Sequence, residues 1–488
     1  MINTPYLHSK APIFLLALVS IIFAFFGVKE VYRIPYLYTY DPGFHYTVTQ
    51  VLDAENPLGM EIPTYDGGSI NAEYPSSMRT YLVALHSISG ISYLDLFKLF
   101  GIFTRIFTAL VIFYVSSYLF KNKVVALIIS IFFLSSYYVF FRAIITFPEN
   151  LVVPFHILVF YEVVKSIQSK RIQIALPFFI AASITIHYPS AVIPLALLLP
   201  LAFYITRDFI QNNQLKRKLF LQTLAALGIF LILSSPVLSN FLQRYQKYTK
   251  VNVGETAVEL IAERGADRYE PIPWSAFVQN IGAVPLLLAV VSIPIIFYKP
   301  KRENVVLLTW LAVTFIFTRG SQLTLFVPTG RMMIYFLIPA IILTGYGLKR
   351  LLDLHQRHLV FSLLFILLAL NFVKTISNIN GWQAVKEPEV NQAKWLNSNL
   401  TETTVLLNSG ALLDNSGFVN FNNLESRDFI YSEIYKDDML NTENLREYYL
   451  GKHVFLAINK SRSSLLLGKE YPILFSEGGS LVYDLGMQ

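Results

Sequence analysis

The sequence predicts an α-helical polytopic membrane protein with a small soluble α/β domain at its C-terminal end. Of the 488 residues, 54% are hydrophobic and only 15% are charged, whereas soluble globular proteins carry roughly 25% charged residues. The apolar residues recur in runs of roughly 17 to 24, the length that a helix needs to cross a bilayer. A change of composition after residue 375 marks the start of the second domain.

Composition also argues against nucleic-acid binding and against cysteine chemistry. The formal net charge is +7, but the basic residues lie between apolar runs and not in one stripe, which indicates membrane topology and no nucleic-acid partner. The chain has no cysteine. Disulfides, thiolate nucleophiles and cysteine-bound metals are therefore excluded.

Roughly eleven transmembrane helices are expected within residues 1–375. They are placed near 12–28, 97–118, 124–141, 149–165, 172–186, 189–206, 219–236, 277–298, 304–318, 331–347 and 358–374. No small-residue cleavage site follows the first run, so it is expected to be a retained helix and not a signal peptide. The stretch SMRTYLVALHSISGISYLDLF is too short and too mixed to span, and it is expected to lie at the membrane interface as an amphipathic helix.

The basic residues orient this chain in the membrane. With a cytoplasmic N-terminus, the inner segments hold roughly sixteen Lys and Arg in about fifty residues, the bias that cytoplasmic loops show. These inner segments include 121–123, 165–171, 207–218, 299–302 and 349–357. The first external loop carries only Lys29, Arg33 and Arg79. An odd number of helices then places the C-terminal domain outside the cell membrane.

Residues 376–488 are predicted to form the external soluble α/β domain. The stretch VNQAKWLNSNLTETTVLLNS predicts a helix followed by a strand. RDFIYS, HVFLAI and ILFSEGGSLVYDL predict further strands, the last of them a hairpin across Glu-Gly-Gly-Ser.

The candidate catalytic residue is Asp41, in the stretch TYDPGFHYTV at the head of the first external loop. An Asp-Pro pair is typical of an ordinary turn, because Asp accepts local hydrogen bonds and Pro sets the backbone angle. A carboxylate at the membrane surface also suits a general base. His45 follows in the same stretch and is a candidate for substrate binding.

Two further external residues are candidates for substrate binding. Glu149 comes directly after Pro148 at the start of a predicted helix, where the helix dipole favours an acid. It is alternatively a second carboxylate that, with Asp41, binds a sugar hydroxyl or a divalent cation, Mg²⁺ or Mn²⁺. No other cofactor is indicated. His187, in TIHYPS, ends one predicted helix, and both a structural and a substrate-binding role are open for it.

Arginines on the external side predict an anionic ligand. Arg331 begins a predicted helix, where its charge opposes the helix dipole, so an anion is expected nearby. Phosphate is the natural candidate, because a guanidinium matches its geometry. Arg319 and Arg264 are further candidates for the same phosphate, and anchoring at lipid headgroups is the alternative for Arg331. The sequence shows no P-loop, GxGxxG or HExxH motif.

Together these stretches resemble the GT-C glycosyltransferases, polytopic enzymes that use polyprenyl-phosphate-linked sugars. The resemblance rests on YTYDPGFHY, NAEYPSSMRTYLVAL, FRAIITFPENL, IHYPS, the helix led by Arg331 and the closing GGSLVYDL. It implies that residues 1–375 form a GT-C-like catalytic domain in contact with membrane lipids. It further implies that Asp41 is the catalytic aspartate and that Arg331 binds the donor phosphate. The acceptor would be a lipid, a glycan or a protein, and the transfer would invert the anomeric centre.

The sequence departs from one group of these enzymes, the oligosaccharyltransferase catalytic subunits, in two ways. Neither Asp41 nor Glu149 belongs to an Asp-x-Asp pair, and neither Trp382 nor Trp395 is followed by Asp. Transfer to asparagine is therefore disfavoured, although an enzyme of this kind acting on protein stays an alternative.

A lipid or sugar transporter or flippase is also open, but it would carry charges at mid-membrane and internal repeats. The interiors of the predicted helices are nearly free of charge, and the sequence shows no repeat. A non-catalytic envelope protein is the third alternative, and it predicts that Asp41, Glu149 and Arg331 are each dispensable.

The charge bias generates a prediction about topology. Protease added to intact cells should remove a tag placed after Gln488, because the C-terminal domain is expected outside. The measurement is an immunoblot of the tag, with a tag before residue 10 as the protected control. Protection of the C-terminal tag would contradict the predicted orientation.

Overall fold

The computed structural model divides the chain into two units. The first comprises Met1–Lys29, Phe100–Ile144 and Pro148–Asn380, and the second comprises Glu30–Leu99, Ile145–Phe147 and Gly381–Gln488. The residues that the structure describes are 4–33, 77–187, 190–211, 221–235, 270–298, 301–323, 329–353, 61–63, 69–71, 404–408, 431–433, 453–459, 472–477 and 480–487, with single residues or short stretches within 37–49, 366–377 and 391–399.

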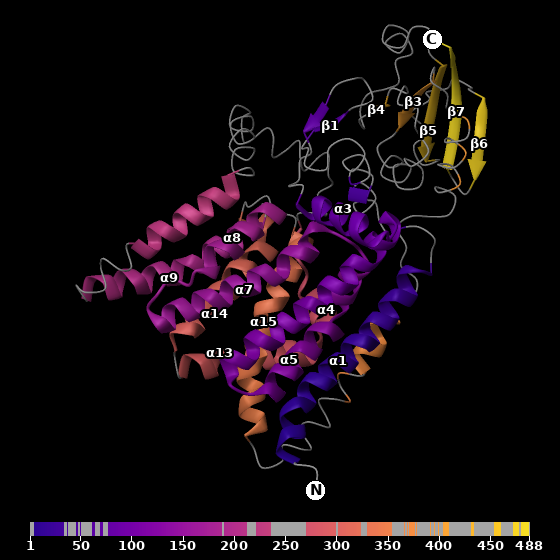
Figure 1. Ribbon diagram of the computed structural model, residues 1–488. Coiled ribbons are helices and arrows are strands. Elements are labelled where there is room, and N and C mark those ends of the chain that lie inside the picture. The colour runs from indigo at the N-terminus through magenta and orange to yellow at the C-terminus, as the bar shows by residue number, and fades with distance from the viewer. Residues whose placement is uncertain are drawn as a thin grey trace. The chain divides into compact units, whose positions relative to one another are not determined.

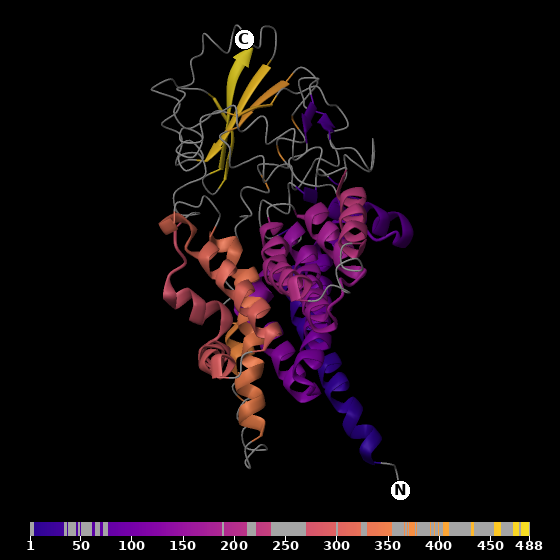
Figure 2. The same ribbon diagram turned by 90° about the vertical axis from the view of Figure 1, so that its left-hand side faces the viewer.

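The first unit is a bundle of helices packed side by side (Figures 1 and 2). Apart from the ends of α1 and α4 that belong to the second unit, its helices are α1 (Thr4–Val31), α4 (Tyr93–Phe120), α5 (Lys123–Ser135), α6 (Tyr137–Ala143), α7 (Pro148–Ser169), α8 (Ala175–Ile186), α9 (Val192–Gln211), α12 (Trp274–Ile281), α13 (Ala283–Tyr298), α14 (Arg302–Thr318) and α15 (Thr329–Leu352). Leu221–Ser235 is a further apolar helix.

Several of these helices are long and apolar enough to cross a membrane. Within the described residues there are four: Lys10–Val31, α4, α7 and α15. The number rises to six if each of two bent pairs, α5 with α6 and α12 with α13, is one span. The predicted polytopic membrane protein is therefore confirmed, whereas the number of eleven spans stays a prediction.

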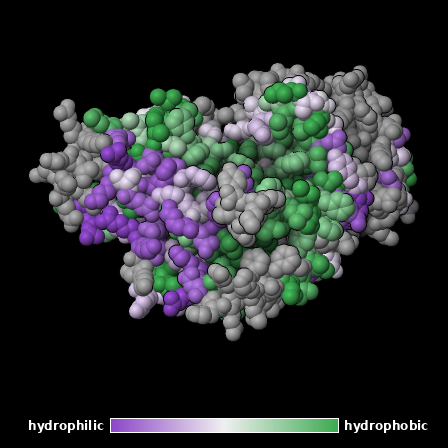
Figure 3. Space-filling view, turned by 60° about the horizontal axis from the view of Figure 1, so that its bottom comes forward, coloured by the Kyte–Doolittle hydropathy of each residue, from purple (hydrophilic) through white to green (hydrophobic). Residues whose placement is uncertain are grey.

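Apolar side chains also cover much of the outer surface of the bundle. Phe14 on α1, Leu199 on α9 and Leu287 on α13 are each more than half exposed, as are many other apolar residues of the same helices. Figure 3 shows large hydrophobic areas beside a region where hydrophilic residues gather. Such surfaces are expected where helices face lipid, because hydrocarbon does not penalise exposed apolar groups.

The interior helix is α15, which packs against α13, α14 and α5. Its glycines permit close approach of the neighbouring helices. The backbone N–H of Gly347 donates to the Ser292 hydroxyl of α13 over 2.9 Å. A Cβ on Gly345 would lie 2.3 Å from the ring of Phe120, so no larger residue fits there without moving that ring.

Two predicted spans, 124–141 and 277–298, are broken helices and not straight ones. The axis bends by 63° between α5 and α6 and by 110° between α12 and α13. Gly282 makes the second break possible with a φ of 99°, a conformation that residues with a Cβ rarely adopt. Side chains satisfy the carbonyls that the breaks expose: Ser136 donates to Ile281, and Asn371 donates to Ser135. The breaks are thus hydrogen-bonded parts of the fold.

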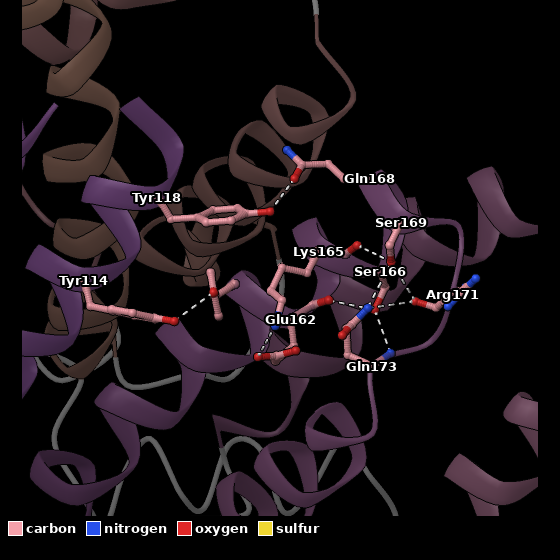
Figure 4. A network of polar contacts seen from close by, with 10 residues as sticks. Tyr114, Tyr118, Glu162, Lys165, Ser166, Gln168, Ser169, Arg171 and Gln173 are labelled. Atoms are coloured by element: carbon pink, nitrogen blue, oxygen red, sulfur yellow. Dashed lines mark hydrogen bonds and ion pairs between the residues drawn. The ribbon is translucent and has the colours of Figure 1, made fainter. Parts of the chain in front are cut away.

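At the C-terminal ends of α4 and α7, polar side chains form a network that Figure 4 shows from close by. The Tyr118 hydroxyl donates to Gln168 over 2.6 Å, and Glu162 pairs with Lys165 at 3.5 Å. Two of the predicted inner basic segments, 121–123 and 165–171, begin at this network. The structure therefore brings two segments of like predicted topology together.

The helical part of the second unit contains α3 (Ser77–Ser89), which covers the first part of the predicted amphipathic stretch. The last residues of that stretch, YLDLF, instead begin α4. α3 ends at Gly90, whose φ of 68° lies in the left-handed region. Arg79 on α3 is buried, and this burial lowers the pKa of its guanidinium to about 10. The side chain is still protonated near neutral pH. Burial, followed by the hydrogen bond to Asp95, raises the pKa of Tyr32 to about 12.

The strands of the second unit form two sheets. β1 (Glu61–Pro63) and β2 (Ser69–Asn71) make a short antiparallel pair. The larger sheet has the order β4-β3-β5-β7-β6. Its strands are β3 (Thr404–Asn408), β4 (Tyr431–Glu433), β5 (His453–Asn459), β6 (Ile473–Glu477) and β7 (Ser480–Met487). β3 pairs in parallel with β4 and β5, whereas β7 pairs antiparallel with β5 and β6.

The predicted strands in TTVLLNS, RDFIYS, HVFLAI and ILFSEGGSLVYDL all overlap strands of this sheet, although RDFIYS shares only Tyr431 and Ser432 with β4. The domain as a whole, with its boundary at residues 375 and 376, stays a prediction.

The close packing at Gly345 is testable by adding one methyl group. Gly345→Ala should lower the free energy of unfolding by about 1–3 kcal/mol, because the Phe120 ring and its neighbours must shift. The matched control is Gly228→Ala in the helix Leu221–Ser235, where nothing lies within 4 Å of the added Cβ. Thermal unfolding in detergent measures both variants, and equal midpoints would contradict the packing described.

Candidate functional site

Glu149 is a buried carboxylate at the start of a membrane helix. It lies in the first turn of α7, and its side chain is 1% exposed. The N-terminal end of a helix stabilises a negative charge, but the dipole alone does not offset the cost of removing a carboxylate from water. Cationic neighbours are therefore required, and α6 and α15 supply them as arginines.

Three nitrogen-bearing side chains surround the same oxygen, Oε1 of Glu149. Arg142 Nη2 lies at 3.5 Å, Arg331 Nη1 at 3.6 Å and His187 Nε2 at 3.7 Å. Arg142 comes from α6, Arg331 from the first turn of α15, and His187 caps the C-terminal end of α8. These four residues are called the Glu149 cluster below, and all belong to the first unit.

The contacts in the Glu149 cluster are long. A charge-assisted N–H···O hydrogen bond usually measures about 2.7–2.9 Å, and Oε1 of Glu149 makes no hydrogen bond within the described part of the chain. The carboxylate is thus neutralised by charges around it without being bound tightly to any one of them. Such a site can rearrange when an anion enters.

His187 is a neutral member of the Glu149 cluster. Its burial, with Arg331 and Arg142 nearby, lowers the pKa of His187 to about 4, although the Glu149 carboxylate opposes this shift. The hydroxyl of Tyr335 lies 3.4 Å from Nδ1. If that hydroxyl donates, the ring proton sits on Nε2 and faces Glu149. Near neutral pH the positive charge of the cluster therefore comes from its arginines.

The first turn of α15, which carries Arg331, is held by hydrogen bonds from its neighbours. The Tyr138 hydroxyl of α6 donates to the carbonyl of Gly330 over 2.6 Å, and the Thr329 hydroxyl donates to the carbonyl of Glu270. The Arg331 side chain is 31% exposed, whereas those of Arg142 and Glu149 are buried. Arg331 therefore connects the buried cluster with the surface of the first unit.

The other predicted site residues are placed differently. Arg319 ends α14 and stacks on aromatic rings, with its guanidinium carbon 4.1 Å from the centre of the Trp274 ring and 5.6 Å from that of Phe277. His45 is buried in the second unit, where its carbonyl accepts a hydrogen bond from Thr49. Asp41 and Arg264 lie outside the described residues.

Sequence reasoning missed several residues around Glu149. Arg142 was not singled out, although it stands in FRAIITFPENL beside Glu149. Arg105 is fully buried in α4, within a predicted span whose interior was expected to be nearly free of charge. A lone arginine in an apolar run is itself a sign of function, so this signal was present. His156 and Tyr335, whose ring centres are 5.3 Å apart, follow no pattern that distinguishes them from core residues.

The described residues around Glu149 do not fit a divalent cation. Two arginines lie within 4 Å of its carboxylate, and positive neighbours repel a dication. In the described ranges, no group of three or more His, Asp or Glu side chains is arranged to bind a metal. The predicted Mg²⁺ or Mn²⁺ at Asp41 and Glu149 stays untested, because Asp41 is not described.

The fold is similar to those of three solved structures. The structure of ArnT from Cupriavidus metallidurans bound to undecaprenyl phosphate has a TM-score of 0.64 with this chain at 12% identity, over 97% of this chain and 98% of the other. The oligosaccharyltransferase of Archaeoglobus fulgidus in its apo form has a TM-score of 0.59 at 12% identity, over 91% and 70%. Arabinofuranosyltransferase AftD from Mycobacteria has a TM-score of 0.56 at 10% identity, over 97% and 42%.

These likenesses define the chain as a protein of the GT-C fold, and the predicted resemblance is confirmed. The model of the EpsG family matches residues 63–386. The chain therefore belongs to the EpsG family. No curated protein sequence matches the chain.

The cluster generates a prediction about stability. Glu149→Gln should lower the free energy of unfolding by about 3–5 kcal/mol, because it leaves buried arginine charge without its carboxylate. The matched control is Glu162→Gln on the same helix, whose ion pair with Lys165 has the same 3.5 Å separation but a partner that is 33% exposed.

Removing that pair should cost less than about 1 kcal/mol. Thermal unfolding in detergent compares the two variants, and a smaller loss at Glu149 than at Glu162 would contradict the electrostatic account of the cluster.

Proposed function

We propose that this chain is an integral-membrane glycosyltransferase that moves a sugar from a polyprenyl-phosphate-linked donor to an acceptor. The observation that carries the proposal is the buried Glu149 carboxylate with Arg142 and Arg331, in a protein of the GT-C fold. The fold supports the reaction class. The arginines support an anionic donor.

The donor phosphate binds at Arg331, with Arg142 deeper in the same cluster. Arg331 is partly exposed and Arg142 is buried, so an anion entering from the surface meets Arg331 first. Guanidinium groups suit phosphate because their planar forks donate two parallel hydrogen bonds. Glu149 offsets the charge of both arginines, and the long contacts let their guanidinium groups turn toward the phosphate.

Asp41 acts as the general base. It takes the proton of an acceptor hydroxyl, whose oxygen forms a bond to the anomeric carbon of the sugar. The bond from that carbon to the phosphate oxygen breaks, and polyprenyl phosphate leaves with one more negative charge than the donor phosphate carried. The arginines stabilise this growing charge, which is the kind of interaction that lowers a reaction barrier. A single displacement inverts the anomeric centre.

The reaction takes place at the outer face of the cell membrane. The bias of Lys and Arg toward alternate loops supports a cytoplasmic N-terminus and an external C-terminal domain. The acceptor, a lipid, a glycan or a protein, binds from that side. The roughly eleven helices of residues 1–375 provide the lipid-facing catalytic domain.

The test is turnover of a lipid-linked sugar by purified protein in lipid. A panel of polyprenyl-phosphate sugars should contain a donor that the wild-type protein consumes and that Asp41→Asn turns over about 10²–10⁴ times more slowly. The amide has the same size as the carboxylate and still accepts the hydrogen bonds of a turn, but it cannot take the proton.

Asp41→Asn should therefore unfold at the wild-type temperature and still bind the donor. Wild-type turnover by this variant would remove Asp41 from the mechanism. Translocation of donors without consumption would instead indicate a flippase.

A second prediction concerns the phosphate. Arg331→Ala should weaken donor binding by about 1.5–3 kcal/mol, the usual worth of a hydrogen bond to a charged group. Arg331→Lys should restore only part of the loss, because an ammonium lacks the planar fork. Equilibrium binding of a labelled donor measures both variants.

The control is Arg319→Ala, which removes the arginine stacked on Trp274. It should change donor affinity less than Arg331→Ala does. The reverse order would move the phosphate site to Arg319.

A further inference from the structure

Arg105 is a fully buried arginine in the middle of α4. Its Nη2 donates to the side-chain oxygen of Asn150, while Nε and Nη1 make no hydrogen bond within the described residues. A buried charge with unpaired donors costs free energy. An apolar residue would fill the same place at lower cost, so stability alone does not account for an arginine here.

The backbone of α4 is shaped to bring Arg105 to Asn150. Gly101, one turn before Arg105, lies against the last residue of α6 and the first turn of α7. A Cβ on Gly101 would stand 2.3 Å from the carbonyl oxygen of Ala143 and 3.0 Å from the Asn150 amide nitrogen. Only glycine permits this approach without displacing the backbone of α6. The contact of Arg105 with Asn150 therefore depends on a specific close packing of helices.

Asn150 connects Arg105 to the Glu149 cluster by a second hydrogen bond. Its amide nitrogen donates to the carbonyl oxygen of Arg142 over 3.0 Å, and it is the residue next to Glu149 in the first turn of α7. One asparagine side chain thus links Arg105 to the backbone that carries Arg142. The Nη2 atom of Arg142 lies 3.5 Å from Glu149.

Arg105 also acts on the cluster through its charge. It is repelled by Arg142 and attracted by Glu149 in the same buried region. Opposite charges favour each other's ionised form and like charges disfavour it, so the charge of Arg105 is coupled to both residues. Both effects act on the two residues whose relative position the Asn150 hydrogen bonds set.

We propose that Arg105 is a positioning residue of the Glu149 cluster, acting through Asn150 to hold Arg142 and Glu149 in the arrangement that receives a phosphate. The proposal rests on the proposed function of that cluster as the donor-phosphate site. Arg105 itself does not contact the donor. It sets the geometry of the residues that do.

The test is a double-mutant cycle on the affinity for undecaprenyl phosphate, measured by equilibrium binding to the purified full-length protein in lipid nanodiscs. Arg105→Gln should weaken binding about tenfold, and Arg142→Gln should weaken it by a similar or larger factor. If Arg105 acts through Arg142, the double variant should bind no more weakly than Arg142→Gln alone. The proposal would be overturned if the loss of affinity in the double variant equalled the product of the two single losses, or if Arg105→Gln bound with wild-type affinity.

A double variant distinguishes loss of donor binding from loss of folding. Arg105→Met with Asn150→Leu removes the guanidinium and its partner together and leaves no buried side-chain amide oxygen without a donor. Because the Arg142 carbonyl also loses its donor in this double variant, we expect it to unfold close to the wild-type temperature and still to lose about tenfold in affinity. A lower unfolding temperature with unchanged affinity would show that Arg105 is only structural.

The matched control is Asn304→Leu, another buried asparagine that bonds a side chain of a different helix, through the Tyr346 hydroxyl. The affinity of this variant for undecaprenyl phosphate should stay within about twofold of wild type, because residues that share no partners with the cluster act independently of it. A loss equal to that of Arg105→Gln would contradict a role specific to the cluster. If the wild-type protein itself does not bind undecaprenyl phosphate, both the proposed function and this inference fail. Unchanged binding in Arg105→Gln alone overturns only the inference.

Discussion

The ionised side chain of Glu149 has to be stabilised inside a bundle whose helices are mostly apolar. Removing a carboxylate from water is among the most expensive steps in building such an interior, and this requirement organises the surroundings of the site. It accounts for arginines on α6 and α15 and for a histidine at the end of α8 within 4 Å of one oxygen atom. It also makes the ends of those helices converge, because each must deliver one polar group.

The broken helices are part of the same solution. The turn at Ser136 separates α5 from α6 and directs the short helix that carries Tyr138 and Arg142 toward the start of α15. A straight helix over residues 124–141 would keep the direction of α5 along the whole segment. The breaks expose backbone carbonyls, and the hydroxyl of Ser136 and the amide of Asn371 satisfy carbonyls on either side of them. Polar groups are thus paired at the points where the regular backbone is interrupted.

Much of this arrangement could be predicted from the sequence, and the limits have physical reasons. Long apolar runs indicate spanning helices because the bilayer sets their length. Short stretches rich in β-branched and aromatic residues indicate strands, and strands of the sheet lie at these stretches. Glu149, His187 and Arg331 were recognised because each stands at the end of a predicted helix, where the helix dipole stabilises or opposes a charge. That they meet at one oxygen atom depends on helix packing, which no local pattern records.

Arg142 and Arg105 were missed for a different reason. Arg105 lies inside an apolar run, where no polar site was sought, and Arg142 stands directly after the predicted span 124–141, in a stretch where only Glu149 was considered. The bends at Ser136 and Gly282 have no signal in the sequence beyond a serine pair and one glycine. Asp41 and Arg264 stay predictions from the sequence alone.

The spacing of the cluster along the chain has a consequence for how the protein is made. Arg142 and Glu149 are seven residues apart, at the facing ends of the consecutive helices α6 and α7. They can therefore pair as soon as these two helices leave the ribosome and enter the bilayer. Arg331 is synthesised only after several more helices have been inserted. During biogenesis the acidic helix therefore crosses the insertion machinery with one counter-charge already beside it, and α15 completes the interior when it arrives.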